Sequence, residues 1–95
     1  MAIDISSNVA SYFANMGLAL HELKQFKNAI NNYDQAIKLK LNYAEAFFNR
    51  GNSLRDLKQL DSAIDSYNQA IFINPKFYTR GKLRKQVTAY DYYDR

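Results

Sequence analysis

The sequence contains no cysteine, one histidine, one proline and three dispersed glycines. The lack of cysteine excludes disulfides, thiolate chemistry and cysteine-based metal sites. The dispersed glycines form no phosphate-binding loop, and there are no paired carboxylates, serine–base arrangements or metal-ligand spacings. His21 has no acidic or histidine partner at helical spacing except the adjacent Glu22, which points elsewhere. We therefore expect no enzymatic activity, no cofactor and no metal, and a histidine that is structural or solvated.

Long apolar runs are also missing, since none approaches the roughly 20 residues that cross a bilayer. Residues 1–11 lack the cationic leader and apolar core of a signal peptide. Apolar residues make up 47% of the chain, an ordinary value for a globular protein, and its length allows one domain at most. These features predict a single cytoplasmic domain, residues 1–95, with no membrane contact.

The positive charge is confined to one end of the chain. Residues 1–75 carry seven basic and seven acidic side chains, whereas the last twenty carry six basic side chains against Asp91 and Asp94. Five of these six form a candidate basic patch: Lys76, Arg80, Lys82, Arg84 and Lys85. Such a patch beside aromatics can bind nucleic acid, but a solvated face or a contact for an acidic protein is the more favoured interpretation.

The chain repeats itself at a spacing of 34 residues. Residues 10–43 and 44–77 align without a gap and share 14 identities, among them Gly17 with Gly51 and Tyr33 with Tyr67. A fixed period of this length is typical of solenoids built from small units that cannot bury their apolar faces alone.

Apolar residues recur at helical spacing and predict an all-α chain. The first stripe is Val9, Phe13, Met16, Leu20 and Leu23, and the second is Phe26, Ala29, Ile30, Tyr33 and Ile37; they recur as Phe47, Leu54, Leu57 and then Leu60, Ile64, Tyr67, Ile71. We expect Ser6 or Ser7 to cap the first helix, Asn42 and Glu45 to form a capping box for the third, and Pro75 to end the fourth.

Five helices with short connections imply two antiparallel hairpins and a closing helix. The boundaries are repeat one at about 10–43, repeat two at about 44–77 and the closing helix at about 78–93. Small residues would allow close helix contacts, Gly17 and Gly51 within the hairpins and Ala36 and Ala70 toward the next helix. We expect the two repeat tyrosines to lie between successive hairpins.

These residues resemble the tetratricopeptide repeat family. Its 34-residue pattern is matched by Phe13, Gly17, Leu20, Ala29, Tyr33 and Ala36, and again by Phe47, Gly51, Leu54, Ala63, Tyr67, Ala70 and Pro75. Leu41 stands where proline is expected, and the closing helix fits poorly, so we interpret it as a cap. The resemblance implies antiparallel helix-turn-helix repeats stacked as a short right-handed α-solenoid.

The resemblance also implies a concave groove that holds a peptide or protein segment. By position it is lined by Asn15, Leu18, Phe48, Asn49, Asn52, Arg55 and Lys82, with Ala14, His21 and Gln86 beside them. Asparagines equivalent to Asn15 and Asn49 form a ladder on a peptide backbone in some family members, because an amide both donates and accepts. The alternative is that both are simply solvated. The family's two-carboxylate clamp is not expected, since only Asn49 fits it.

Phe48 has two interpretations. It could be a rigid aromatic anchor facing the groove, or it could be covered by a neighbouring side chain or the closing helix.

We therefore predict a non-catalytic protein–protein interaction scaffold. The first alternative is a self-assembling structural element, a homo-oligomer, because two repeats leave apolar faces uncovered at both ends. The first helix, with Leu18 and Leu20, and the tyrosine-rich C-terminus are the surfaces expected to associate. A nucleic-acid adaptor using the basic patch is the least favoured alternative.

Overall fold

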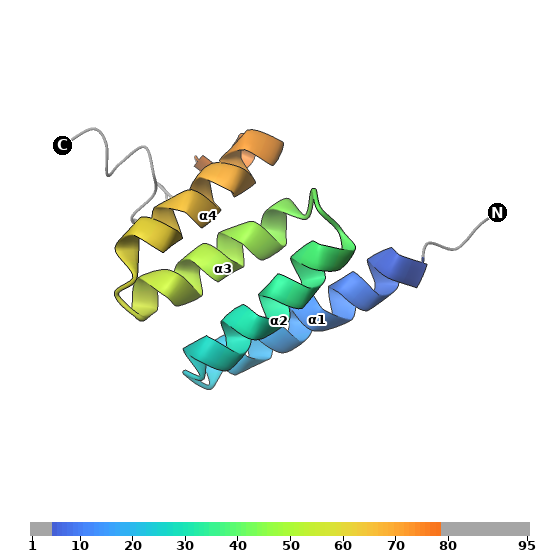
Figure 1. Cartoon of the computed structure of the whole chain (residues 1–95), viewed down its shortest axis with the longest axis horizontal. Helices are drawn as coiled ribbons and strands as arrows, with labels where there is room; N and C mark the ends of the chain where they lie inside the picture. Colours follow the sequence, from blue (N-terminus) through green and yellow to red (C-terminus); the bar gives the residue numbers. More distant parts are fainter. Residues whose placement is uncertain (1–4, 79–95) are drawn as a thin grey trace.

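Four α-helices make up most of residues 5–78, the part of the chain described by the computed structural model (Figure 1). They are α1 (Ile5–Glu22), α2 (Phe26–Leu39), α3 (Ala44–Asp56) and α4 (Leu60–Ile73). Residues 76–78 begin a further helical turn just after Pro75. The described range contains no strand, which confirms the all-α prediction. The expected closing helix lies outside the described residues from position 79 onward.

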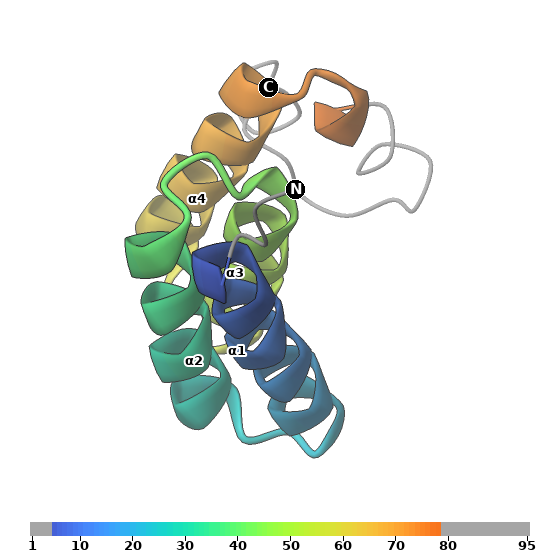
Figure 2. The same cartoon turned by 90° about the vertical axis from the view of Figure 1, so that its right-hand side faces the viewer.

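The helices pack as two hairpins, α1 with α2 and α3 with α4. Figures 1 and 2 show α2 lying beside α3, so that the second hairpin stacks on the first. This is the arrangement predicted from the 34-residue period, because each hairpin covers part of its apolar surface with its neighbour.

Both hairpin turns use the same backbone motif. After α1, the Lys24 N–H donates to the His21 carbonyl and the Gln25 N–H to the Leu20 carbonyl. These are the two hydrogen bonds of a Schellman motif, which places one residue in the left-handed region. That residue is Lys24, with φ of 63°, and Lys58, with φ of 66°, takes the same place after α3. Glycine is the usual residue at this position, so both turns carry local backbone strain.

A glycine in the first helix of each hairpin accepts the ring of a tyrosine from the second. A Cβ on Gly17 would lie 2.6 Å from Cε1 of Tyr33, and one on Gly51 would lie 2.7 Å from Cδ1 of Tyr67. Both rings are fully buried. The close helix approach at these glycines is confirmed. The tyrosines, however, pack within their own hairpins, and the expectation that they wedge between hairpins is wrong.

The core has two parts. Ala14, Ala36 and Ala46 bring α1, α2 and α3 together around small side chains. The larger part is centred on the second hairpin and contains these buried residues: Phe48, Leu54, Ala63, Tyr67, Ala70, Ile71 and Phe77. The predicted roles of Ala36 and Ala70 at helix contacts agree with this packing.

The first helix differs from prediction in which side it buries. Its buried line is Ala10, Ala14 and Gly17, whereas Val9 and Met16 of the predicted apolar stripe are exposed. Periodicity correctly located an apolar stripe, but α2, together with Ala46 of α3, covers the small residues on another side of the helix.

The predicted caps are also wrong. Ser6 and Ser7 lie inside α1, and Tyr43, not Asn42, is the N-cap residue of α3, without a side-chain capping bond. By contrast, α4 ends at Ile73, two residues before Pro75, as expected.

Candidate functional site

The α1–α3 face is the surface formed by the first helices of the two hairpins, where the groove was predicted. Asn15 on α1 is exposed and Asn49 on α3 is half-buried, and the two occupy equivalent positions 34 residues apart. Neither side-chain amide has a hydrogen-bond partner within the described range of 5–78. Both amides therefore remain open to a ligand.

Two other predicted groove residues differ from each other although they too are repeat equivalents. Leu18 on α1 is 46% exposed. Asn52 on α3 is 9% exposed, and its Oδ1 accepts a hydrogen bond of 2.6 Å from the Tyr67 hydroxyl. Leu18 offers an apolar contact at the surface, while the Asn52 side chain is held in the core by Tyr67.

Phe48 is not a surface anchor. Its side chain is 1% exposed, and its ring centre lies 5.6 Å from that of Tyr67 and 5.1 Å from that of Phe77. Phe77 belongs to the turn that follows Pro75, so the covered alternative describes Phe48 and the groove-anchor interpretation is wrong. Helical periodicity could not decide this, because Phe47 and Phe48 are adjacent, and Tyr67 and the chain after Pro75 determine which of them is covered.

His21 links the two hairpins at one end of the α1–α3 face. Its Nδ1 lies 2.7 Å from Oγ of Ser53 and its Nε2 lies 3.2 Å from Oδ2 of Asp56. The ring also packs edge-on against Phe26, with centroids 5.0 Å apart. These contacts support a structural role. Sequence reasoning missed the partners because they come from α3, more than thirty residues away.

The same Asp56 carboxylate also holds Arg55. The Arg55 Nε donates to Oδ1 of Asp56 at 3.2 Å, and a second guanidinium nitrogen lies 3.2 Å from the same oxygen. A guanidinium has five N–H donors, so Arg55 can bind another acceptor without leaving Asp56.

Arg50 joins three helices on the opposite side of α3. Its Nε donates to Oδ1 of Asp34 at 2.6 Å, and its Nη1 donates to Oγ of Ser66 at 2.6 Å. The two acceptors belong to α2 and α4, so one guanidinium ties both hairpins together. This residue was not singled out from the sequence, where arginine replaces the methionine of the first repeat.

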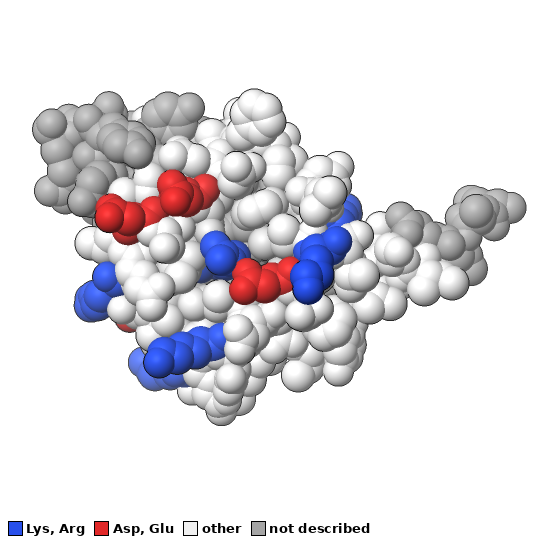
Figure 3. All heavy atoms as spheres, in the orientation of Figure 1, with Lys and Arg blue, Asp and Glu red and all other residues white. Residues whose placement is uncertain are grey.

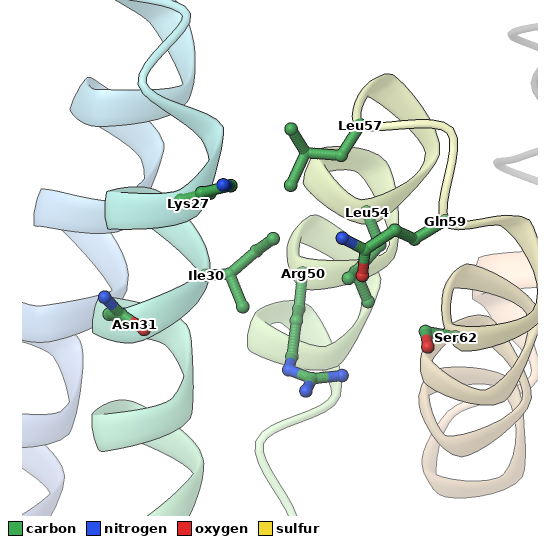
Figure 4. A pocket seen from close by; sticks show the side chains of 8 residues that line it. All are labelled: Lys27, Ile30, Asn31, Arg50, Leu54, Leu57, Gln59 and Ser62. Carbon is green, nitrogen blue, oxygen red and sulfur yellow. The ribbon is translucent and has the colours of Figure 1, made fainter.

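A hollow of about 390 Å³ lies next to Arg50, between α2, α3 and the start of α4. Figure 4 shows Ile30 of α2 and Leu57, the residue just after α3, extending toward it from either side. It is lined by Lys27, Ile30, Asn31, Arg50, Leu54, Leu57, Gln59 and Ser62. The hollow is a concave surface that the sequence pattern did not predict.

The predicted basic patch is described only at Lys76. This lysine is exposed, and its Nζ lies 5.6 Å from the centre of the Phe77 ring. Arg80, Lys82, Arg84 and Lys85 lie outside the described residues, as does Gln86. On the face shown in Figure 3, acidic and basic side chains are interspersed. The described residues therefore form no extended surface of one sign on that face.

The described residues also bear on metal binding and on membrane insertion. Within residues 5–78 no group of three or more histidine or acidic side chains is placed to hold a metal ion. None of the four helices is long and apolar enough to cross a membrane.

Comparison with known proteins identifies the family to which the two helix hairpins belong. A family model described as TPR repeat matches residues 17–54, and one described as Tetratricopeptide repeat matches residues 44–77. No curated protein matches the chain at a significant level. The two models together span residues 17–77, from the last part of α1 to the turn after α4. TPR repeats are generally non-catalytic protein–protein interaction modules. The chain therefore belongs to the tetratricopeptide repeat family.

Proposed function

We propose that this chain is a non-catalytic scaffold that binds an extended segment of a partner protein along the α1–α3 face. It acts as one cytoplasmic domain in this proposal. The family supplies the general role, since its repeats bind proteins. The side chains of α1 and α3 support the choice of this face and of its binding residues.

The observation that carries the proposal is the pair Asn15 and Asn49. Each amide can donate to a carbonyl and accept from an N–H of the same peptide backbone. Packed helices lie about 8–10 Å apart, which an extended chain spans in about three residues. One peptide can therefore contact both amides, and backbone recognition of this kind tolerates many side chains.

Leu18 and Arg55 add selectivity to that backbone contact. Leu18 presents an apolar side chain one turn from Asn15, and burying it against a ligand is favourable. Arg55, half-buried beside Asp56, retains guanidinium donors for an acceptor on the ligand. The ligand favoured by this face has one apolar side chain flanked by polar or acidic groups. The buried side chains of Asn52 and Phe48 lie beneath this face and support it.

A comparison of variants in a lysate tests the proposal. The full chain, an Asn15→Ala/Asn49→Ala variant and a control Asn31→Ala/Asn68→Ala variant are used as bait. The control removes two exposed asparagines from α2 and α4. We expect the bait and the control to capture the same protein and the first variant to lose it. Equal capture by all three baits would contradict binding through Asn15 and Asn49. Phe48→Ala is unsuitable, because the buried cavity it creates would cost about 3–5 kcal/mol.

A further inference from the structure

The first helix exposes a regular line of apolar side chains, which we name the α1 seam. Its members are Ile5, Val9, Tyr12, Met16, Ala19 and, just beyond the helix, Leu23. All six are exposed, Ile5 at 70%, Tyr12 at 59% and Leu23 at 67%. In Figure 2 the helix lies at the front of the molecule.

The spacing of the α1 seam is that of a coiled coil. Successive members are separated by four, three, four, three and four residues. This alternation is the a and d pattern of a heptad repeat, a narrow line suited to one facing helix. The buried Ala10, Ala14 and Gly17 lie on the other side of the same helix, against the rest of the fold. Thus α1 is apolar on two sides, and one of them lacks a partner among residues 5–78.

The α1 seam does not have the shape of a contact between repeats of this chain. In α3 the equivalents of Tyr12 and Met16 are Ala46 and Arg50. Ala46 is fully buried in the contact with the first hairpin, where its small size allows close packing. Arg50 is engaged with Asp34 and Ser66. A hairpin that stacked on α1 in the same way would meet a tyrosine where only a methyl group fits.

The α1 seam matches itself when two helices run antiparallel. Ile5 of one copy then opposes Leu23 of the other, Val9 opposes Ala19, and Tyr12 opposes Met16. Each layer pairs an a position with a d position, and the Tyr12–Met16 layer brings a thioether against an aromatic ring. A parallel pair would instead place Tyr12 on Tyr12 and Ala19 on Ala19, which matches sizes poorly. Antiparallel helices also align opposite dipole ends.

Charge favours a second copy as well. Residues 5–22 contain one formally charged side chain, Glu22, and the exposed polar residues beside the seam include Ser6, Asn8 and Asn15. Two copies with a formal net charge of +4 each repel at long range, but their α1 helices can approach without opposing like charges. A strongly acidic or basic partner would find no complementary charge along most of this helix.

We propose that two copies of the chain associate through the α1 seam as an antiparallel, two-fold symmetric helix pair. The exposed parts of the six side chains amount to on the order of 500 Å² of mostly apolar surface, so pairing buries roughly 1,000 Å² in total. That is the lower limit for a specific interface, so the dimer forms reversibly at micromolar or higher concentrations. The proposed pairing uses a different line of α1 from Leu18 and Leu20, which the sequence suggested as an association surface together with the tyrosine-rich C-terminus.

Sedimentation equilibrium from micromolar to millimolar concentration tests the proposal. The variants are Tyr12→Lys/Met16→Lys and a matched control, Leu41→Lys/Phe72→Lys, which charges two exposed apolar side chains outside α1. Circular dichroism verifies that all variants remain helical. We expect a monomer–dimer equilibrium whose dissociation constant rises about tenfold or more in the first variant and changes little in the control. A monomer throughout, or equal effects of both variants, would overturn the proposal.

Cross-linking tests the direction of the helices, since the chain has no cysteine of its own. An oxidised mixture of Val9→Cys and Ala19→Cys proteins should form a mixed disulfide-linked dimer, because these positions face each other. Either protein alone should cross-link much less. Efficient linking of Val9→Cys to itself would overturn the antiparallel arrangement.

Discussion

The Tyr67 hydroxyl donates a hydrogen bond of 2.6 Å to Oδ1 of Asn52, deep in the second hairpin. In the first hairpin the equivalent hydroxyl, on Tyr33, is buried without a hydrogen-bond partner. The difference arises at one position, because Leu18 replaces the asparagine. Two hairpins of the same architecture therefore contain one satisfied and one unsatisfied tyrosine, and this makes them a natural pair for stability measurements.

Removal of each hydroxyl should have opposite consequences. Tyr67→Phe leaves the buried Asn52 oxygen without its donor and should lower the free energy of unfolding by about 1–2 kcal/mol. Tyr33→Phe removes a buried polar group that has no partner, so it should be neutral or stabilise by up to about 1 kcal/mol. Urea unfolding followed by circular dichroism measures both. Equal losses in the two variants would contradict the pairing described here.

Leu18→Asn should supply the missing acceptor. Because Leu18 is almost half exposed, little apolar burial is lost, and a bond to Tyr33 should raise the free energy of unfolding by about 1 kcal/mol. The control is the same substitution in a Tyr33→Phe background, where no hydroxyl is present. If Leu18→Asn stabilises both backgrounds equally, its effect does not come from that hydrogen bond.

Stability should fall at alkaline pH because of the same tyrosine. Burial, with a smaller effect of the Glu22 carboxylate, raises the pKa of Tyr33 well above its ordinary value of 10.0. Below pH 10 both states keep the proton and the contribution is constant. Above pH 10 the unfolded chain loses the proton first, so the free energy of unfolding should fall by about 1.4 kcal/mol per pH unit from this residue.

Denaturant unfolding between pH 8 and pH 11 checks that slope. Tyr33→Phe should show a smaller alkaline decrease than the parent chain, while Tyr12→Phe, which removes an exposed hydroxyl, should not differ from it. An unchanged decrease in Tyr33→Phe would exclude Tyr33 as its source.

The hairpin turns should gain stability from glycine. Lys24 and Lys58 adopt positive φ, where a lysine is strained and glycine is not. Because glycine also increases the entropy of the unfolded chain, Lys24→Gly or Lys58→Gly should stabilise by only about 0.5–1 kcal/mol. Gln35→Gly in the middle of α2 is the control and should destabilise by about 1 kcal/mol. Thermal unfolding ranks the three, and a loss of stability in both lysine variants would contradict the strained turn.

The sequence period was sufficient to predict the hairpins, their antiparallel packing and the close approach at Gly17 and Gly51. Those features depend on contacts within one repeat, and the residues that make these contacts recur in both repeats. The buried state of Phe48 was not predictable, because it depends on Phe77 in the turn after Pro75 as well as on Tyr67. The position of the exposed stripe on α1 was missed for a related reason. Periodicity finds an apolar line on a helix, but the helices that pack against it, chiefly α2 in the case of α1, decide which line is covered.

The candidate site was predicted less completely than the fold. Asn15, Leu18 and Asn49 are at the surface as the family resemblance implies, whereas Asn52 is engaged by Tyr67. His21 and Arg50 make their hydrogen bonds to side chains of other helices, so no local sequence pattern predicts their partners. Side-chain roles that depend on three-dimensional neighbours need the structure.

Amide chemical-shift mapping is the measurement that tests the proposed function most directly. The isotope-labelled chain is titrated with a peptide from the captured partner, and the affected amides are located on the four helices. Binding along the α1–α3 face predicts the largest changes in α1 and α3 around Asn15, Leu18 and Asn49, and their loss in Asn15→Ala/Asn49→Ala. Changes centred instead on Ile30, Leu57 and the hollow between α2 and α4 would contradict it.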